Sequence, residues 1–162
     1  MKLSKRNVFI IASIAITIVI DQISKVIVRA SIGKNEVIPI IGDYFSLHNV
    51  ENEGAFLGMG SELNEPLRVV LLLILPIIVL GFVLRYIIKD KTLDKWSLFA
   101  FSAIIGGGIA NVFDRIALGS VTDFLFIKLT DVLRTGIFNV ADMFVTTGMA
   151  ILIVVNFRKN KK

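Results

Sequence analysis

The stretch PLRVVLLLILPIIVLGFVLRYII, residues 66–88, decides the fold class of this 162-residue chain. Its only charged side chains are Arg68 and Arg85. A run of about 20 apolar residues matches the roughly 30 Å hydrocarbon core of a bilayer. The run therefore predicts a membrane-spanning helix. Pro76 lies inside it and predicts a kink, because proline cannot donate a helical hydrogen bond.

Three more apolar runs of similar length lie at about residues 8–28, 96–113 and 137–157. The chain is 55% hydrophobic, whereas a soluble domain is typically about 45–50% apolar. We therefore expect four spans within a single domain, residues 1–162. The first run could instead be a cleaved signal peptide. We reject that reading because the run is longer than a signal peptide's apolar region and contains Asp21 and Lys25.

Lysine and arginine flank the spans at three places: before the first span, between the second and third, and after the fourth. Basic loops stay on the cytoplasmic side of a membrane, so both termini are predicted to be cytoplasmic. The opposite loops, about 29–65 and 114–136, then face outward. The same placement explains the net charge of +5, and we expect no nucleic-acid partner.

The first outer loop contains EVIPIIGDYFSLHN, residues 36–49, in which β-branched and aromatic residues are broken by Pro39 and Gly42. This pattern predicts short strands. The expected fold class is an all-α membrane protein with four transmembrane helices and a small extracytoplasmic β-rich region.

The chain contains no cysteine, and His48 is its only histidine. Disulfides and thiolate nucleophiles are therefore excluded. A single histidine also argues against zinc hydrolysis and a Ser-His pair. We expect no cofactor and no metal.

Charged side chains within spans are costly and persist when they are paired or functional. Asp21 and Lys25 are four residues apart and share a helix face, which favours an ion pair that fixes helix packing. Ser24 and Lys25 would suggest a serine–lysine dyad. Adjacent side chains on a helix point about 100° apart, which argues against that dyad.

A second polar cluster, Asn111, Asp114 and Arg115, follows three consecutive glycines, residues 106–108. Glycines within a span allow another helix to approach closely. The cluster is consistent with helix capping and an interfacial salt bridge, and equally with a place in an active site.

Asp123 lies in an apolar loop segment, and Asp142 lies about one turn into the fourth span, on the same face as Asn139. Two neighbouring carboxylates cannot both ionise cheaply, so such a pair holds one proton. One member can then act as a base and the other as an acid. The sequence leaves open whether Asp123 and Asp142 meet or each has a structural role.

These motifs together resemble those of the bacterial lipoprotein signal peptidases, also called signal peptidase II. The resemblance covers essentially the whole chain and rests on five motifs in the family's order: Asp21-Gln22-Ile23-Ser24-Lys25 (DQxxK), Asn52-Glu53-Gly54-Ala55 (NxGA), Gly107 to Arg115 (GNxxDR), Val121-Thr122-Asp123-Phe124 (VxDF) and Phe138-Asn139-Val140-Ala141-Asp142 (FNxAD). The chain departs from the pattern at Phe56 and Ala110, and neither departure removes a carboxylate.

The resemblance implies an aspartyl endopeptidase of the bacterial inner membrane, with its site on the extracytoplasmic side. It implies a prolipoprotein substrate cut just before a diacylglyceryl-modified cysteine, by a monomer surrounded by membrane lipid. The family's catalytic residues correspond to Asp123 and Asp142. Its substrate-binding or supporting residues correspond to Asp21, Lys25, Asn52, Gly54, Gly108, Asn111, Asp114, Arg115 and Asn139.

Two other classes of protein use similar features. A small proton-coupled carrier or channel subunit would also hold intramembrane aspartate and lysine. A noncatalytic scaffold would bind the precursor without cutting it.

Overall fold

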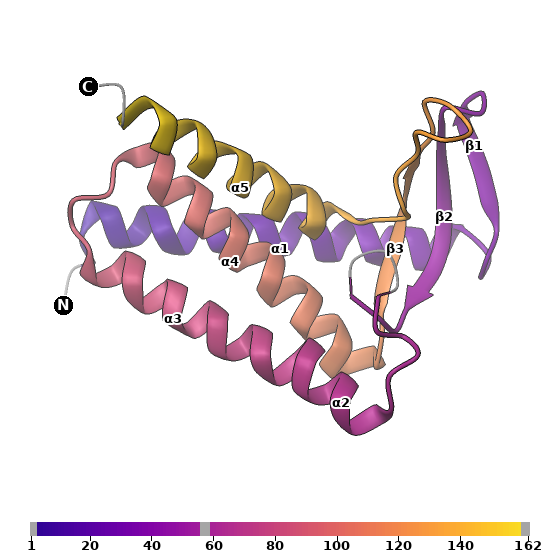
Figure 1. Cartoon of the computed structure of the whole chain (residues 1–162), viewed down its shortest axis with the longest axis horizontal. Coiled ribbons are helices and arrows are strands. Elements are labelled where there is room, and N and C mark those ends of the chain that lie inside the picture. The colour runs from indigo at the N-terminus through magenta and orange to yellow at the C-terminus, as the bar shows by residue number, and fades with distance from the viewer. Residues whose placement is uncertain (1–2, 56–58, 160–162) are drawn as a thin grey trace.

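Figure 1 shows the computed structural model of the chain, which describes residues 3–55 and 59–159. Long helices run along one another, and a small sheet lies at one end of the helix bundle. Both chain ends lie at the opposite end from the sheet. The helices are α1 (Lys5–Ser31), a continuous helix of α2 (Glu65–Val69), η2 (Val70–Ile74) and α3 (Leu75–Lys89), then α4 (Lys95–Leu118) and α5 (Val140–Lys159).

All four helices are long and apolar enough to cross a membrane, which confirms the predicted number of spans. The most apolar 18-residue window of the helix from Glu65 to Lys89 has a mean hydropathy of 3.0, and none of that window is buried inside the protein. Phe82 in this helix is 69% exposed. An apolar surface of this extent indicates contact with lipid.

Two boundaries differ from the prediction. Helix α4 continues to Leu118 and ends at Gly119, whose φ of 79° is the left-handed conformation favoured at helix ends. Asp114 and Arg115 are therefore helical residues, and not part of the loop predicted over 114–136. Helix α5 begins at Val140 because Asn139 caps it, and not at residue 137.

Just before Pro76 the chain forms the π-helical turn η2. The Pro76 nitrogen cannot donate to the carbonyl of Leu72, four residues earlier, which lies in this turn. The structure thus has a π-helical turn just before this proline, where the sequence predicts a kink.

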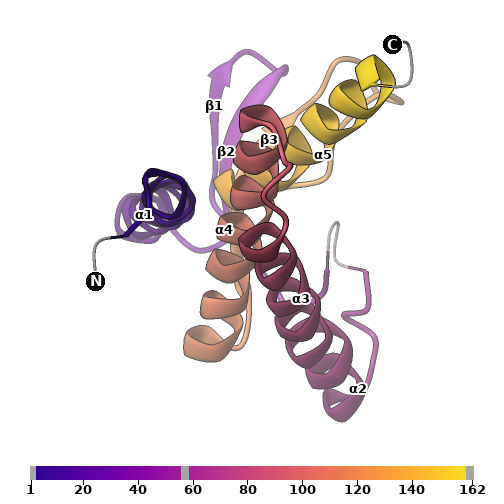
Figure 2. The same ribbon diagram turned by 90° about the vertical axis from the view of Figure 1, so that its left-hand side faces the viewer.

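Helix α4 lies between the other helices (Figure 2). Its three consecutive glycines face three different neighbours. A Cβ on Gly106 would lie 2.7 Å from Thr17 Cβ of α1, one on Gly107 2.5 Å from the Ala141 carbonyl oxygen of α5, and one on Gly108 2.7 Å from Leu80 of α3. The predicted close approach is confirmed, and it holds the bundle together around α4.

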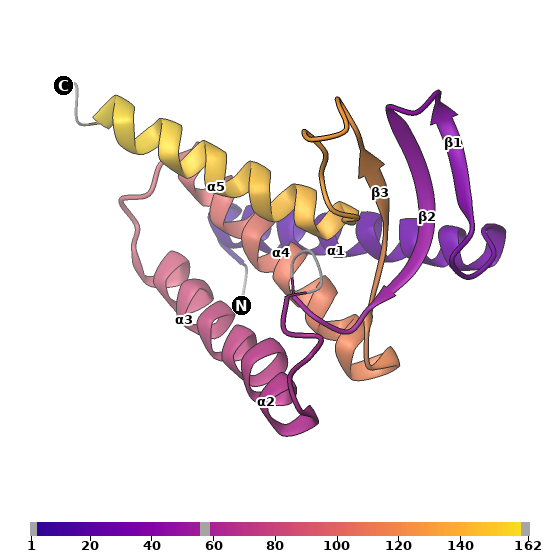
Figure 3. The same ribbon diagram turned by 45° about the vertical axis from the view of Figure 1, so that its right-hand side comes forward.

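The sheet contains β1 (Val37–Ile41), β2 (Phe45–Asn52) and β3 (Val121–Ile127), antiparallel in the order β1-β2-β3 (Figure 3). The first two strands were predicted, whereas β3 was wrongly assigned to a loop. The burial of β3 explains the error, because its first four residues are all buried and its sequence lacks polar–apolar alternation. Phe124 packs with Val28 and Ile32, which fixes the sheet to the end of α1.

Candidate active site

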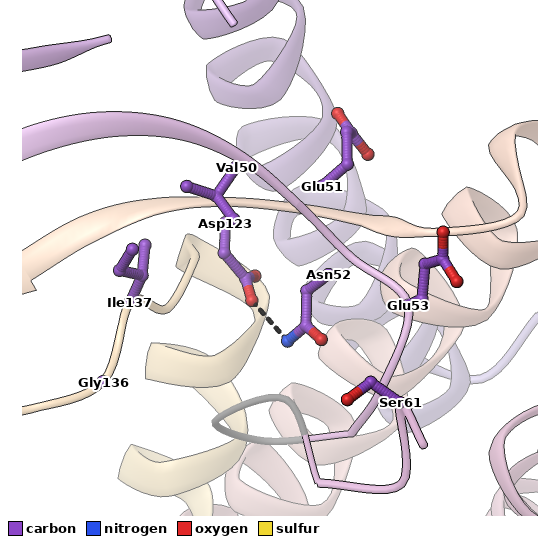
Figure 4. Close-up of a pocket in the computed structure, with 8 residues that line it drawn as sticks. All are labelled: Val50, Glu51, Asn52, Glu53, Ser61, Asp123, Gly136 and Ile137. Carbon is purple, nitrogen blue, oxygen red and sulfur yellow. Dashed lines mark hydrogen bonds between the residues drawn. The ribbon is translucent and has the colours of Figure 1, made fainter. Parts of the chain in front are cut away.

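Asp123 projects from β3 into a pocket formed between the sheet and the start of α5. Its side chain is 3% exposed. Oδ2 accepts a hydrogen bond from Asn52 Nδ2 at 2.8 Å, and Oδ1 accepts one from Asn139 Nδ2 at 2.6 Å. Figure 4 shows Asp123 and Asn52 pointing toward each other, while Glu51 points to the other side of its strand. Residues from three parts of the chain thus meet at one carboxylate.

Asp142 lies in the first turn of α5, where Asn139 and Asp142 cap the helix reciprocally. The Asp142 N–H donates to Asn139 Oδ1 at 2.9 Å, and the Asn139 N–H donates to Asp142 Oδ2 at 3.2 Å. Oδ1 of Asp142 also accepts from Asn111 Nδ2 of α4 at 2.9 Å. The predicted shared face of Asn139 and Asp142 is confirmed. The positive end of the helix dipole lies beside this carboxylate.

Two asparagines connect the two carboxylates. Asn139 donates from Nδ2 both to Asp123 and, at 3.2 Å, to Asn111 Oδ1. Asn111 in turn donates to Asp142. Asn139 is 0% exposed, so its bonds form away from solvent. The structure therefore brings Asp123, Asn139, Asn111 and Asp142 into one hydrogen-bonded chain that spans β3, α4 and α5.

Burial raises the pKa of Asp123 to about 6. The hydrogen bonds from Asn52 and Asn139 favour the ionised form and oppose this rise. The nearby charge of Asp142 adds to it, because two neighbouring negative charges repel. Asp123 can therefore gain or lose a proton close to neutral pH, which is the property required of a general acid or base.

A second buried network supports the first. Lys25 Nζ lies 2.8 Å from Asp21 Oδ2 and 2.8 Å from Asp114 Oδ2, and it donates to Asn111 Oδ1 at 2.8 Å. The predicted Asp21–Lys25 pair is confirmed. The second oxygen of Asp21 accepts the backbone N–H of Ala141 at 2.7 Å, which connects α1 to the start of α5.

Of the two readings left open for Asp114, the structure excludes the interfacial salt bridge. Asp114 is 1% exposed and pairs with Lys25, and Gln22 Nε2 donates to its other oxygen at 2.8 Å. Arg115, the next residue on the helix, points elsewhere. Its NH2 donates to the Gly54 carbonyl at 2.9 Å. The Gly54 N–H donates to Asn52 Oδ1 at 2.9 Å, so Arg115 supports the loop that orients Asn52.

Gly108 and Ser24 lie outside these contacts. Gly108 faces Leu80 of α3. The Ser24 hydroxyl donates to the Asp21 carbonyl oxygen of its own helix at 2.6 Å. His48 lies in β2, where its Nε2 is 2.8 Å from Ser46 Oγ. Among residues 3–55 and 59–159, no three acidic or histidine side chains are placed to hold a metal ion.

A third polar network on the other side of the sheet was missed from the sequence. Glu51 accepts hydrogen bonds from Ser120 Oγ at 2.5 Å and Thr122 Oγ1 at 2.9 Å. Arg29 at the end of α1 donates to Thr122 Oγ1 at 2.7 Å. Thr122 and Asp123 are adjacent in β3 and point to opposite faces. Once residues 121–127 are assigned to a strand, the opposite directions of neighbouring side chains place Thr122 on the face away from Asp123. This was the one signal in the sequence for the third network.

The pocket beside Asp123 has a volume of about 470 Å³. It is bordered by residues 50–53 at the end of β2, by Ser61, and by Gly136 and Ile137 before α5. Gly58 and the departure at Phe56 lie outside the described residues, and Ser61 borders the pocket.

A family model described as signal peptidase (SPase) II matches residues 13–158. The chain belongs to the signal peptidase II family. Relatives named lipoprotein signal peptidase include those of Treponema denticola (34% identity, covering 91% of this chain and 90% of the relative), Borrelia hermsii (37%, 91% and 89%) and Streptococcus thermophilus (35%, 95% and 95%).

A solved structure described as a bacterial membrane enzyme is similar over 94% of this chain and 91% of its own, with a TM-score of 0.82 and 25% identity. A second solved structure with the same description has a TM-score of 0.77 and 24% identity, and shows the fold alone. The chain is thus a multi-pass membrane protease of the signal peptidase II family.

Proposed function

We propose that this chain is an aspartyl endopeptidase that removes the signal peptide from diacylglyceryl-modified prolipoproteins, cutting before the lipid-modified cysteine. Asp123 and Asp142 are the catalytic pair. The observation that carries this proposal is the chain of amide hydrogen bonds through Asn139 and Asn111 that holds the two carboxylates in one site. The names of the relatives support the choice of substrate.

The pair acts with one proton between its two members. The ionised carboxylate takes a proton from water as the water oxygen attacks the scissile carbonyl carbon. The protonated carboxylate gives its proton to the carbonyl oxygen. When the resulting gem-diol collapses, one of its hydroxyl protons returns to the ionised carboxylate. The other carboxylate protonates the amide nitrogen as the carbon–nitrogen bond breaks.

The supporting residues act through the pair. Asn52 and Asn139 hold Asp123, and Asn111 holds Asp142. Lys25 holds Asn111, and Asp21 and Asp114 neutralise Lys25. Arg115 and Gly54 position the loop that carries Asn52. Donors fixed in a buried site need no reorganisation during the reaction, which lowers its barrier.

The test is cleavage of a diacylglyceryl-modified precursor by the purified protein in detergent. Asp123→Asn and Asp142→Asn should each abolish cutting while leaving the thermal unfolding of the protein cooperative. Asp131→Asn is the matched control, because Asp131 is 93% exposed and pairs with Lys128, away from the site. Full activity in either dyad variant would refute the catalytic pair.

The same assay separates the alternatives. A scaffold would bind the precursor, and neither the wild type nor the variants would release product. A proton-coupled carrier would move protons across vesicles without cutting the precursor.

We further propose that both termini face the cytoplasm of a bacterial inner membrane, that the site opens on the other side, and that one chain of a single domain is active. The basic residues at the end of the bundle away from the sheet support this orientation. The chain has no cysteine, so Val132→Cys and Lys91→Cys report the two sides cleanly. A membrane-impermeant thiol reagent applied to intact spheroplasts should label only Val132→Cys, and labelling of Lys91→Cys instead would reverse the orientation.

A further inference from the structure

A cluster of hydrogen bonds joins β2 to β3 on the face of the sheet opposite Asp123. Glu51 and Thr122 lie directly across from each other in the two strands. Glu51 Oε1 accepts the Thr122 hydroxyl at 2.9 Å, and Oε2 accepts the Ser120 hydroxyl at 2.5 Å. Arg29 at the end of α1 donates from Nη1 to Thr122 Oγ1 at 2.7 Å. These four residues, here called the Glu51 clamp, connect β2, the start of β3 and α1.

The Glu51 clamp is largely buried. Thr122 is 0% exposed and Ser120 is 8% exposed. The three hydrogen bonds lie among the four residues of the clamp, and Figure 4 shows Glu51 pointing to the side of its strand away from Asp123. Removing one partner from such a cluster leaves another polar group buried without a hydrogen bond, which is costly. The clamp therefore acts on the two strands and on α1, and not on the pocket beside the carboxylate.

The clamp lies next to an irregularity in the pairing of β2 with β3. Leu47 pairs with Leu125, and the next pair in the ladder is Val50 with Asp123. Three steps along β2 thus match two steps along β3, so β2 contains one extra residue, which is a β-bulge. A slip of one residue would turn every side chain of a strand to the other face. The direction of the Asp123 side chain therefore depends on a register that is fixed beside this bulge.

The same two strands form one of the anchors of Asp123. Asn52 follows Glu51 in β2, and Asp123 follows Thr122 in β3. Successive side chains of a strand point to opposite faces. The 2.8 Å bond from Asn52 to Asp123 therefore lies behind the bond between Glu51 and Thr122. A shift of β2 along β3 that displaced one of these bonds would also displace the other.

We propose that the Glu51 clamp positions the catalytic pair: it fixes β2 against β3 beside the bulge and so holds Asn52 against Asp123. Glu51 and Thr122 are positioning residues, because they act through Asn52. Arg29 extends the clamp to α1, the helix whose polar side chains support the catalytic pair. The inference rests on the proposed function and adds residues that act from the far face of the sheet. The alternative is a clamp that only stabilises the sheet.

Replacing Thr122 with valine tests the proposal, because valine keeps the shape of threonine and removes the hydroxyl. We expect Thr122→Val to lower kcat for a diacylglyceryl-modified precursor about 10- to 100-fold with little change in KM, since a misplacement of about 1 Å can cost about a hundredfold in rate. Thr122→Ser keeps the hydroxyl and should recover most of kcat. Thr130→Val is the matched control, because Thr130 is exposed in the loop after β3 and accepts only a local N–H from Leu133 in that loop. Its kcat should equal that of the wild type.

The pH–rate profile separates positioning from stabilisation of the sheet. The Asn52 hydrogen bond lowers the pKa of Asp123, so loosening it in Thr122→Val should move the limb near pH 6 to higher pH. A clamp that only stabilises the sheet would lower Tm and leave the limb in place. Charged groups face Asp123 from three helices and from the pocket beside it: Lys25 of α1, Arg115 of α4, Asp142 of α5, and Glu51 and Glu53. The substitution changes none of these charges.

A double variant tests whether the clamp acts through Asn52. In Asn52→Ala the clamp has no bond to Asp123 left to position. Adding Thr122→Val should therefore lower kcat by less than about a further twofold and leave the limb in place, because effects of residues in one network are not additive. Effects on kcat that multiply in the double variant would contradict the proposal, since that is the behaviour of independent sites.

Ser120→Ala is a second variant that does not require β3 to tolerate valine. It removes one of the two bonds to Glu51, so it should lower kcat by a smaller factor and move the limb in the same direction. If Thr122→Val does not unfold cooperatively, Ser120→Ala decides alone, and a wild-type kcat with an unmoved limb overturns the inference. If the wild type cuts no precursor at all, the proposed function fails. If it cuts normally and the variants show neither effect, only this inference fails.

Discussion

Replacing Lys25 with methionine would leave two carboxylates in the bundle interior without a cation. Lys25 is 0% exposed, and its Nζ lies 2.8 Å from both Asp21 and Asp114, which are 0% and 1% exposed. Breaking a buried ion pair by removing one partner costs about 3–5 kcal/mol. A folded protein typically has only about 5–15 kcal/mol of stability in total. The variant should therefore lose a large part of its stability.

The expected change in the melting temperature follows from this cost. For a chain of this length, about 1 kcal/mol lowers Tm by roughly 2–4 °C, so Lys25→Met should lower Tm by about 6–20 °C. The assay is thermal unfolding of the purified protein in a single detergent, followed by intrinsic fluorescence or circular dichroism. Lys5→Met is the control, because Lys5 is exposed at the start of α1, and its Tm should stay within about 1 °C.

A triple variant separates charge from packing. Asp21→Asn combined with Lys25→Met and Asp114→Asn removes all three charges. Replacing a whole buried ionic group is often nearly neutral, so the triple variant should recover most of the Tm lost in Lys25→Met. A fall of less than about 2 °C in the single variant would refute the reasoning. A triple variant as unstable as the single variant would show that packing dominates.

Two further predictions concern helix packing and pH. Gly107→Ala should destabilise the protein by about 1–3 kcal/mol, because its Cβ would lie 2.5 Å from the Ala141 carbonyl oxygen; Gly81→Ala, where a Cβ meets nothing within 4 Å, should not lower Tm. The Asn52 hydrogen bond lowers the pKa of Asp123, so Asn52→Ala should move the limb of the pH–rate profile near pH 6 to higher pH.

The first of these predictions would be contradicted by equal melting temperatures for the two glycine variants. The second would fail if the limb stayed in place or moved to lower pH, since losing a donor to a carboxylate removes stabilisation of its ionised form only.

Much of the helical framework could be predicted because it depends on local properties. The run at residues 66–88 specifies a span by composition, since the backbone within lipid must satisfy its own hydrogen bonds. Two side-chain pairs could be predicted because spacing within one helix sets the distance between side chains. These are Asp21 with Lys25, and Asn139 with Asp142. The three glycines at 106–108 indicated close helix contacts, although not that each faces a different helix.

The contacts between elements could not be predicted in the same way. Strand β3 forms because β2 supplies its hydrogen-bonding partners, and its sequence shows no strand periodicity. Asp114 pairs with Lys25 and not with Arg115 because the crossing of α1 and α4 brings the lysine to it. The asparagine bridge between Asp123 and Asp142 requires the register of β3 and the cap of α5 together.

The sequence by itself therefore determined the four spans, the first two strands and the residues that could carry the chemistry. Only the tertiary structure decided which of those residues touch, and that a hollow borders each of the two carboxylates. The physical reason is that spacing along one helix is set by its own geometry, whereas contacts between helices and strands depend on the packing of the whole bundle.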